Sequence, residues 1–311
     1  MDKNETPNLS VLSYEGNYEK IREILEKRNP FVELSKTSMT KSERDKIDDY
    51  KKIIYYACLG GHTRILQLLI ENYNVKFYNP HIAMYNAGFA NHEDIIELLY
   101  KDYDMNIDHA LYGACKGGHV RLFKKILKKY DFSAEDIKSN KITIFEYACK
   151  GGHEDMINFL IKNDLYDWNH GFIGACEGGQ LEIVKWLYKE HKSELDIYDV
   201  FTHGTIGGNL QLILWGIEMV EQLDNKYKYP IAWDDIFNTA SEEGQLEILA
   251  WIVEHHRKYV DLYEGFRRAC SKGRKSAADW IIEKNKKLDW KKWPIYVDMI
   301  QLEDYREKRP L

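Results

Sequence analysis

The 311-residue sequence contains only 6 prolines and 5 cysteines, and it has no long apolar run. No stretch approaches the roughly 20 apolar residues that a membrane-spanning helix needs. The first residues, MDKNETPNLSVLSYEGN, lack the basic and then apolar order of a secretory signal peptide. An odd number of cysteines argues against a closed disulfide framework and is typical of a reducing compartment. We therefore expect a soluble, intracellular protein without membrane attachment.

A strong excess of positive charge is also absent. The chain carries 44 Lys and Arg against 50 Asp and Glu, a net charge of −6, which gives no general attraction to nucleic acid or anionic lipid. Charge is nevertheless uneven, because residues 267–309 hold 13 Lys and Arg against 7 Asp and Glu. Such a basic end could bind nucleic acid or an acidic partner. The alternative is a solvated end whose charge only keeps it soluble.

The sequence does contain one phrase that recurs. YACKGGHEDMINFLIKN begins at Tyr147, and similar phrases begin at Tyr56, Gly113 and Gly174. We align them on the residue that follows the glycine pair and call it the marker; successive markers are 27 to 36 residues apart. The markers are His62, His92, His119, His153, Gln180, Asn209, Gln245 and Arg274, with Asn17 in a degenerate first unit. Such a period predicts a repeat architecture.

Two further columns follow the same register. The residue eight positions before the marker is always apolar: Ile54, Met84, Leu111, Phe145, Phe172, Phe201, Phe237 and Phe266. The residue five positions before it is always Ala or Gly, and a helical apolar pattern follows the marker. Each unit therefore predicts a short helix, a glycine-containing break and a second amphipathic helix. Because no unit can cover its own apolar face, the units must stack.

This pattern resembles the ankyrin repeat. The resemblance is carried by ACLGGHTRILQLL from Ala57 and ACEGGQLEIVKWL from Ala175, and it covers roughly residues 9–285. It implies an all-α ankyrin-repeat solenoid of about nine helix–turn–helix units. The family's T-P-L-H start is missing and some units are short, so we expect short or missing β-hairpin fingers, with longer excursions only near residues 128–144 and 218–235. In style the repeats are most similar to ankyrin-repeat proteins of giant DNA viruses of amoebae.

The ends and one insertion depart from the repeat. We expect residues 1–8 to be disordered and residues 286–311 to form a C-terminal capping segment that covers the last repeat. An insertion near residues 28–50 follows the first unit. Within it Thr40 and Glu43 have the spacing of a capping box, which predicts an extra or extended helix before Ile53.

Neither the cysteines nor the histidines of the repeat suggest chemistry. All five cysteines follow the small residue directly, in a column that faces the packed interior, where free Cys behaves as a small hydrophobe. One cysteine per unit cannot converge on a shared metal ion. The marker histidines are replaced by Gln and Asn in other units, as expected of turn residues that hydrogen-bond loop backbone. We predict no catalytic residue, no metal site, no cofactor and no enzyme activity.

In ankyrin proteins partners usually bind the concave face, which is formed by the first helices and the loops before them. Carried over column by column, the resemblance gives a candidate partner-binding set: Tyr56, Phe89, Lys116, Tyr147, Lys150, Glu177, His203 and Arg268. Its aromatic members would be good hot-spot anchors; alternatively, they cover neighbouring glycine-rich turns.

The sequence thus predicts a monomeric, non-catalytic scaffold that binds a protein partner. If the viral resemblance holds, the scaffold is a viral protein that engages a host factor in the host cytoplasm. Nucleic-acid or acidic-partner binding by the basic residues 267–309 is the alternative.

Overall fold

The structure is a computed structural model of the chain, and it describes residues 8–27, 41–73, 80–103, 105–223 and 229–285. These residues form helices and connecting turns, with no β-strand among them. The chain divides into two compact units, Met1–Tyr166 and Asp167–Leu311, called here the N-terminal and C-terminal units. The all-α fold expected from the sequence is confirmed.

The helices follow one another in pairs. Those of the N-terminal unit are α1 (Leu9–Tyr14), α2 (Tyr18–Lys27), α3 (Lys41–Gly60), α4 (Thr63–Tyr73), α5 (Pro80–Phe89), α6 (Glu93–Tyr103), α7 (Asp108–Lys116), α8 (Val120–Lys129), α9 (Ala134–Ser139), α10 (Lys141–Gly151) and α11 (Glu154–Lys162). Those of the C-terminal unit are α12 (Trp168–Glu177), α13 (Leu181–His191), α14 (Asp199–Gly207), α15 (Leu210–Glu221), α16 (Trp233–Glu243), α17 (Leu246–His256), the 3-10 helix η2 (Arg257–Tyr259), α18 (Leu262–Ser271) and α19 (Lys275–Lys284). Leaving aside α9 and η2, the described residues form nine pairs, as the repeat pattern predicts.

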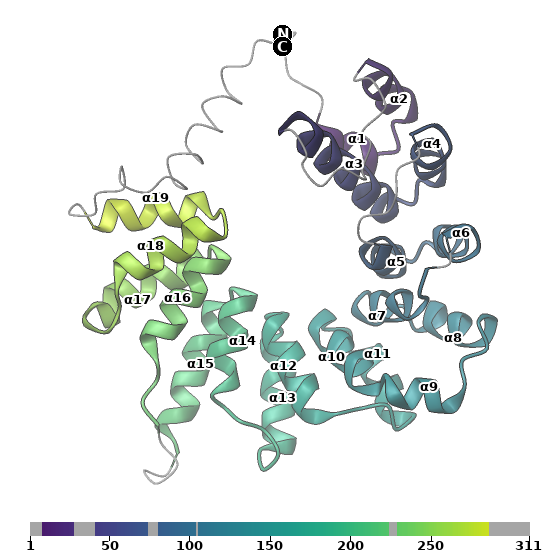
Figure 1. Cartoon of the computed structure of the whole chain (residues 1–311). Helices are drawn as coiled ribbons and strands as arrows, with labels where there is room; N and C mark the ends of the chain where they lie inside the picture. Colours follow the sequence, from purple (N-terminus) through teal and green to yellow (C-terminus); the bar gives the residue numbers. More distant parts are fainter. Residues whose placement is uncertain (1–7, 28–40, 74–79, 104, 224–228, 286–311) are drawn as a thin grey trace. The chain divides into compact units, whose positions relative to one another are not determined.

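Within each unit the pairs stack in two layers. In the N-terminal unit the first helices of successive pairs pack on one another, α1 on α3, α3 on α5, α5 on α7 and α7 on α10. Second helices form the other layer, with α2 on α4, α4 on α6 and α8 on α11. In the C-terminal unit α12, α14, α16 and α18 pack in succession, and Figure 1 shows α14, α16 and α18 side by side. This stacking gives each apolar face the cover that a single pair lacks.

One turn geometry joins the two helices of every described pair. The residue before the marker always has a positive φ, between 64° and 81°, at Gly16, Gly61, Asn91, Gly118, Gly152, Gly179, Gly208, Gly244 and Gly273. Glycine adopts this left-handed conformation without a Cβ penalty, and Asn is among the few other residues that tolerate it. The marker N–H then donates back to the carbonyl five residues earlier, as from His62 to Ala57 at 2.9 Å. This bond satisfies a carbonyl at the end of the first helix.

In six of the described repeats the marker side chain hydrogen-bonds to a carbonyl of the preceding repeat. Nε2 of His62 lies 2.7 Å from the carbonyl oxygen of Tyr14, and Nε2 of His119 lies 2.8 Å from that of Phe89. Because a carbonyl only accepts, Nε2 carries the hydrogen in both cases. Gln245 makes the equivalent bond to the Ile206 carbonyl at 3.2 Å. The predicted hydrogen bond from the marker to loop backbone is therefore found, but in these repeats the carbonyl belongs to the repeat before. At Gln180 the bond goes instead to the Gly178 carbonyl of its own turn, at 3.1 Å.

The two columns before the marker form the core. The apolar column, which includes Phe145, Phe172 and Phe237, is buried throughout, and so is the Ala or Gly column. Burying one such Phe side chain stabilises the fold by about 1.5–3 kcal/mol. All five cysteines are free and buried, as predicted.

The insertions take helical form where the structure describes them. Helix α3 begins at Lys41 and runs on into the second repeat, so the helix expected before Ile53 is an extension of that repeat's first helix. The excursion near residues 128–144 contains α9, which Ser133 and Asp136 begin with a capping box. Asn8 is the N-cap of α1. The expectations for residues 1–7, for Thr40 and for the cap at residues 286–311 lie outside the described residues.

In two helix pairs of the C-terminal unit, a stacked Trp and His join the two helices of the pair. The ring of Trp168, at the start of α12, lies 3.8 Å from that of His191, at the end of α13. Trp233 and His256 repeat this contact between α16 and α17 at 3.7 Å. Burial, with a smaller effect of neighbouring cations, lowers the pKa of His256. These stacks hold the start of a first helix against the end of its second helix.

Candidate partner-binding surface

The first helices of the N-terminal unit place four aromatic rings outside the core columns. Tyr85 and Phe89 lie on α5, Tyr112 on α7 and Tyr147 on α10, and we call these four residues the aromatic surface. Phe89 is 38% exposed, and the three tyrosines are half-buried. Each ring therefore keeps part of its surface available for contact.

Two glycines explain why rings from different helices meet. A Cβ at Gly113 would overlap the carbonyl oxygen of Tyr85, and a Cβ at Gly88 would overlap that of Ala110. Only glycine allows the backbones of α5 and α7 to approach this closely. The close approach brings the first-helix side chains of adjacent repeats within ring-contact distance.

Tyr147 contacts two of the other three rings of the aromatic surface and so links α10 to α5 and α7. Its ring stacks on that of Tyr112, with centroids 5.7 Å apart and planes at 6°, and it lies 5.5 Å from the ring of Tyr85. Tyr85 in turn stacks with Phe89, at 6.4 Å and 9°. These separations are typical of favourable aromatic pairs. The rings therefore support one another across three repeats and present a preorganised apolar surface.

Polar groups border the rings. The ammonium of Lys116 lies 5.9 Å from the centroid of Phe89, at the outer limit of a cation–π contact. The Tyr112 hydroxyl donates to Oδ1 of Asn140 at 2.6 Å. Burial raises the pKa of Tyr112 to about 12, so its hydroxyl stays protonated at neutral pH. Burial also raises the pKa of Tyr85 above its usual value.

The structure brings some of the sequence-predicted residues together. Phe89 and Lys116 are in contact, and Tyr147 belongs to the same surface. Tyr56 packs against Tyr55 at 4.9 Å, and Lys150 is half-buried on α10. The sequence pattern suggests exposed aromatic rings at Tyr56 and Tyr147, whereas both are half-buried because rings of the same or neighbouring helices pack on them.

The residue six positions before the marker, directly before the Ala or Gly column, is not exposed in every repeat. Asn86 and Gly113, which share it with Tyr56 and Tyr147, are buried because adjacent first helices approach closely there.

Sequence reasoning missed two members of the aromatic surface. Tyr85 and Tyr112 lie seven positions before the marker, one position earlier than the column we considered. They precede Phe89 and Lys116 by four residues, and residues four apart share a face of a helix. This four-residue spacing is the sequence feature from which Tyr85 and Tyr112 could have been predicted.

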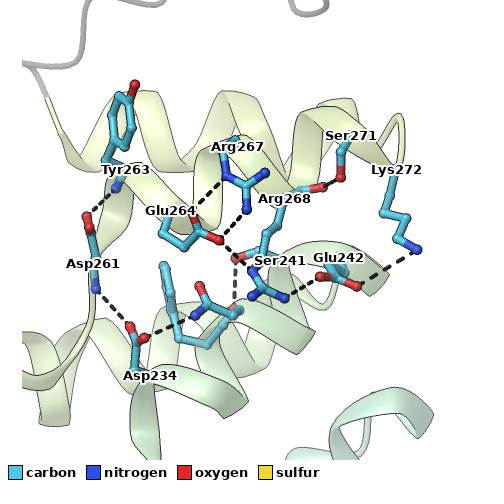
Figure 2. Close-up of polar contacts among 12 residues, drawn as sticks. Asp234, Ser241, Glu242, Asp261, Tyr263, Glu264, Arg267, Arg268, Ser271 and Lys272 are labelled. Atoms are coloured by element: carbon cyan, nitrogen blue, oxygen red, sulfur yellow. Dashed lines mark hydrogen bonds and ion pairs between the residues drawn. The ribbon is translucent and has the colours of Figure 1, made fainter.

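In the C-terminal unit the predicted residues pair with one another or with neighbouring carboxylates. Nδ1 of His203 lies 2.9 Å from Oε1 of Glu177. Arg268 donates from Nη1 to Glu242 at 2.5 Å and from Nε to Glu264 at 2.8 Å, and Figure 2 shows this network between α16 and α18. The first helices here present compensated charges, in contrast to the rings of the N-terminal unit.

Other kinds of site receive no support from the described part of the chain. Within it, no three His, Cys, Asp or Glu side chains come close enough together to hold a metal ion. Burial raises the pKa of every cysteine thiol, which disfavours the reactive thiolate. None of the described helices is both long enough and apolar enough to cross a membrane.

Comparison with known proteins agrees with the repeat geometry. A sequence model of ankyrin repeats (3 copies) matches residues 111–199. An ankyrin repeat and KH domain-containing protein of Caenorhabditis briggsae is 26% identical over 144 residues. That match covers 42% of this chain and 5% of the relative, so the chain spans only a small part of the relative's length. Residues 111–199 are thus ankyrin repeats, and the same helix pair and left-handed turn recur in the described residues on both sides of them, as in an all-α ankyrin solenoid.

Proposed function

We propose that this chain is a non-catalytic scaffold that recognises a protein partner through the aromatic surface and the loops beside it. The observation that carries the proposal is the row of four rings across α5, α7 and α10, which are held in contact but left part-exposed. Tyr side chains are enriched among interface hot spots, and rigid rings lose little entropy on binding. Ankyrin repeats generally mediate protein–protein interaction, which supports the same function.

The nature of the partner follows from the resemblance stated above. Repeats in the style of giant-virus ankyrin proteins suggest a viral protein that engages a host factor, and we propose that it acts as a soluble monomer in the host cytoplasm. Lys116 lies 5.9 Å from the ring of Phe89, and Lys150 lies on α10, three residues after Tyr147. Acidic groups on the partner would therefore suit the edges of the aromatic surface.

Nucleic-acid binding by residues 267–309 is the competing function, and only residues 267–285 of that segment are described. There the cations already have partners. Arg267 and Arg268 bind Glu264, Arg274 binds Glu243 at 3.1 Å, and Lys275 binds Asp279 at 2.7 Å. A phosphate backbone would have to compete with these carboxylates for the cations. We therefore favour the protein-binding surface.

The test is a quantitative pull-down from host-cell lysate, with the full chain as bait at moderate and at high salt. One variant, Phe89→Ala with Tyr147→Ala, removes two rings of the aromatic surface. A matched control, Tyr100→Ala with Tyr130→Ala, removes a ring pair 4.4 Å apart on the second-helix side. The control is well matched because Tyr100 is 39% exposed and Phe89 38%. Thermal melts of each bait show whether it is folded.

We expect a partner that the wild type and the control retain in high salt and that the ring variant loses. Losing hot-spot residues should weaken binding by about thirtyfold or more, which corresponds to roughly 2 kcal/mol. Retention of the partner by a folded ring variant would refute the aromatic surface. Capture of nucleic acid that salt releases, with the ring variant unaffected, would favour the basic end instead.

A further inference from the structure

A cavity of about 590 Å³ lies on the second-helix side of the C-terminal unit. Its walls come from the last turns of α15 and α17, from the start of α16 and from residues 229–231, which lead into α16. The interval between markers is longest here, with 36 positions from Asn209 to Gln245. The volume of the cavity is within the range of about 300–1,000 Å³ typical of ligand pockets. Neither the aromatic surface nor the proposed function accounts for it.

Apolar and aromatic side chains form most of the wall. Leu214 and Ile217 line the cavity from α15, and Ile231 lines it from the connection before α16. Two indoles line it as well, Trp233 from α16 and Trp251 from α17. Both are half-buried, and their ring centroids lie 5.8 Å apart with the planes at 50°. The two rings therefore form an aromatic corner in the wall.

Histidine rings hold both indoles in place. His256 stacks on Trp233 at 3.7 Å and 9°, and His255 stacks on Trp251 at 4.7 Å and 20°. Nδ1 of His255 donates to the backbone carbonyl of Trp251 at 2.9 Å, which fixes the imidazole beside the indole. Because burial lowers the pKa of His256, its ring is uncharged at neutral pH. The aromatic corner is therefore preorganised.

The wall carries negative charge. Glu221, the last residue of α15, lines the cavity, and its carboxylate forms no hydrogen bond or ion pair with a described residue. No Lys or Arg is found among the described residues that line the cavity. The faces of the indole rings are also electrostatically negative. The cavity therefore suits a cation that presents an apolar surface.

We propose that this cavity binds a quaternary ammonium group, such as that of choline or of a trimethylated lysine side chain. The methyl groups of such an ion can contact the indoles of Trp233 and Trp251, and its positive charge is attracted to the ring faces. A plain ammonium suits the cavity less, because it is strongly hydrated and would have to lose that water. Glu221 supplies the opposite charge. The inference does not depend on the aromatic surface of the N-terminal unit.

Two pairs of small probes test the cavity. Choline is compared with 3,3-dimethylbutan-1-ol, which has its shape without its charge, and Nα-acetyl-Nε-trimethyllysine amide is compared with Nα-acetyllysine amide. Each is titrated into the 15N-labelled full chain, and the indole N–H signals of Trp233 and Trp251 are followed by NMR. We expect the methylated cations to shift both signals and to bind about fivefold more tightly than their comparison probes, as a cation–π contact implies. The tighter of the two methylated cations indicates whether a choline-type ligand or a modified protein side chain is the source.

Two variants, each with a matched control, locate the binding. Trp251→Leu should weaken choline binding severalfold, whereas Trp186→Leu changes the equivalent residue of α13, which does not line the cavity, and should leave binding unchanged. Glu221→Gln should reduce the preference for choline over its neutral analogue severalfold. Glu218→Gln removes a charge from another exposed position of α15 that does not line the cavity, and it should change little. Thermal melts show whether each variant is folded, and the exposed Glu221 keeps the test decisive if the tryptophan variant unfolds.

Several results would overturn the proposal. These are unchanged Trp233 and Trp251 signals at the highest soluble probe concentration, equal binding of choline and its neutral analogue, or equal effects of Glu221→Gln and Glu218→Gln. The probe titration decides the cavity and the pull-down decides the aromatic surface. Failure of one is therefore distinguishable from failure of the other.

Discussion

The left-handed residue before each marker, which is glycine in every described repeat except at Asn91, allows a sharp test of the inter-repeat hydrogen bond. Gly208 and Gly273 occupy equivalent turns, with φ of 73° and 68°. A Cβ at Gly208 would overlap the side-chain amide of Gln245, which donates to the Ile206 carbonyl at 3.2 Å. A Cβ at Gly273 meets no described atom within 4 Å. Gly273→Ala therefore tests backbone strain alone, whereas Gly208→Ala adds loss of the hydrogen bond.

The expected magnitudes separate the two effects. A non-glycine residue in the left-handed region costs about 1–2 kcal/mol, which is the whole effect predicted for Gly273→Ala. Displacing Gln245 adds the net value of one hydrogen bond, about 0.5–1.5 kcal/mol, so Gly208→Ala should cost about 1.5–3.5 kcal/mol. Gln245→Ala should then cost almost nothing in the Gly208→Ala background, because the bond is already lost. A double-mutant cycle measures that coupling.

The assay can be confined to one unit. All 8 tryptophans of the chain lie after Asp167, so tryptophan fluorescence during urea unfolding follows the C-terminal unit. If Gly208→Ala and Gly273→Ala cost the same, and if Gln245→Ala is additive with Gly208→Ala, the hydrogen bond between repeats contributes nothing and the reasoning fails.

Three further predictions concern packing, thiols and pH. Gly113→Ala would drive a Cβ into the backbone of α5, 2.7 Å from the Phe89 nitrogen, and should destabilise the N-terminal unit by about 3 kcal/mol or more, measured by far-UV circular dichroism in urea. A loss below about 1 kcal/mol would contradict the close approach of α5 and α7. All 5 thiols should resist Ellman's reagent in the folded protein and react in denaturant, since burial raises the pKa even of Cys270 to about 12; rapid reaction of any folded thiol would show that its helix opens. Hydrogen bonds from Arg267 and Arg268 lower the pKa of Glu264 from 4.5 to about 2. This stabilisation is present above pH 4.5 and is lost as the pH falls toward 2, so the destabilisation by Glu264→Gln at pH 7 should shrink over that interval, and an undiminished difference at pH 2 would argue against the ion pairs.

The sequence predicted the layout of a single repeat well. Its apolar column, small column and glycine turn depend on residues within about eight positions of one another, and the structure confirms all three at Phe237, Ala240 and Gly244. The uncovered apolar face of each unit predicted the stacking, and the resemblance to ankyrin repeats supplied the solenoid of helix–turn–helix units. These features recur in every unit, so independent columns could be checked against each other.

Contacts between repeats were harder to predict, because they depend on how far one pair is rotated relative to the next. No spacing in the sequence indicates that His119 reaches the Phe89 carbonyl, or that Tyr147 stacks on Tyr112. The same reason explains why Glu177 and His203, two predicted partner-binding residues, are found paired with each other. The cavity beside Trp233 combines side chains from α15, α16, α17 and the connection before α16, and no one of these segments indicates it by itself.

The marker has a consequence for how such arrays diverge. The hydrogen bond to the preceding repeat requires only a side-chain donor long enough to reach a backbone carbonyl. Four different residue types provide such a donor, at His62, Asn209, Gln245 and Arg274, and the carbonyl that accepts differs slightly in position between repeats. Different residue types can therefore occupy the marker position, provided that the residue before it is Gly or Asn and keeps the left-handed conformation. The repeats differ in sequence while their turns share one conformation. The ankyrin-repeat sequence model accordingly matches residues 111–199, whereas the left-handed turn is found from Gly16 to Gly273. Across the described repeats of this chain, the conformation of the turn is therefore kept more uniformly than the identity of the marker residue.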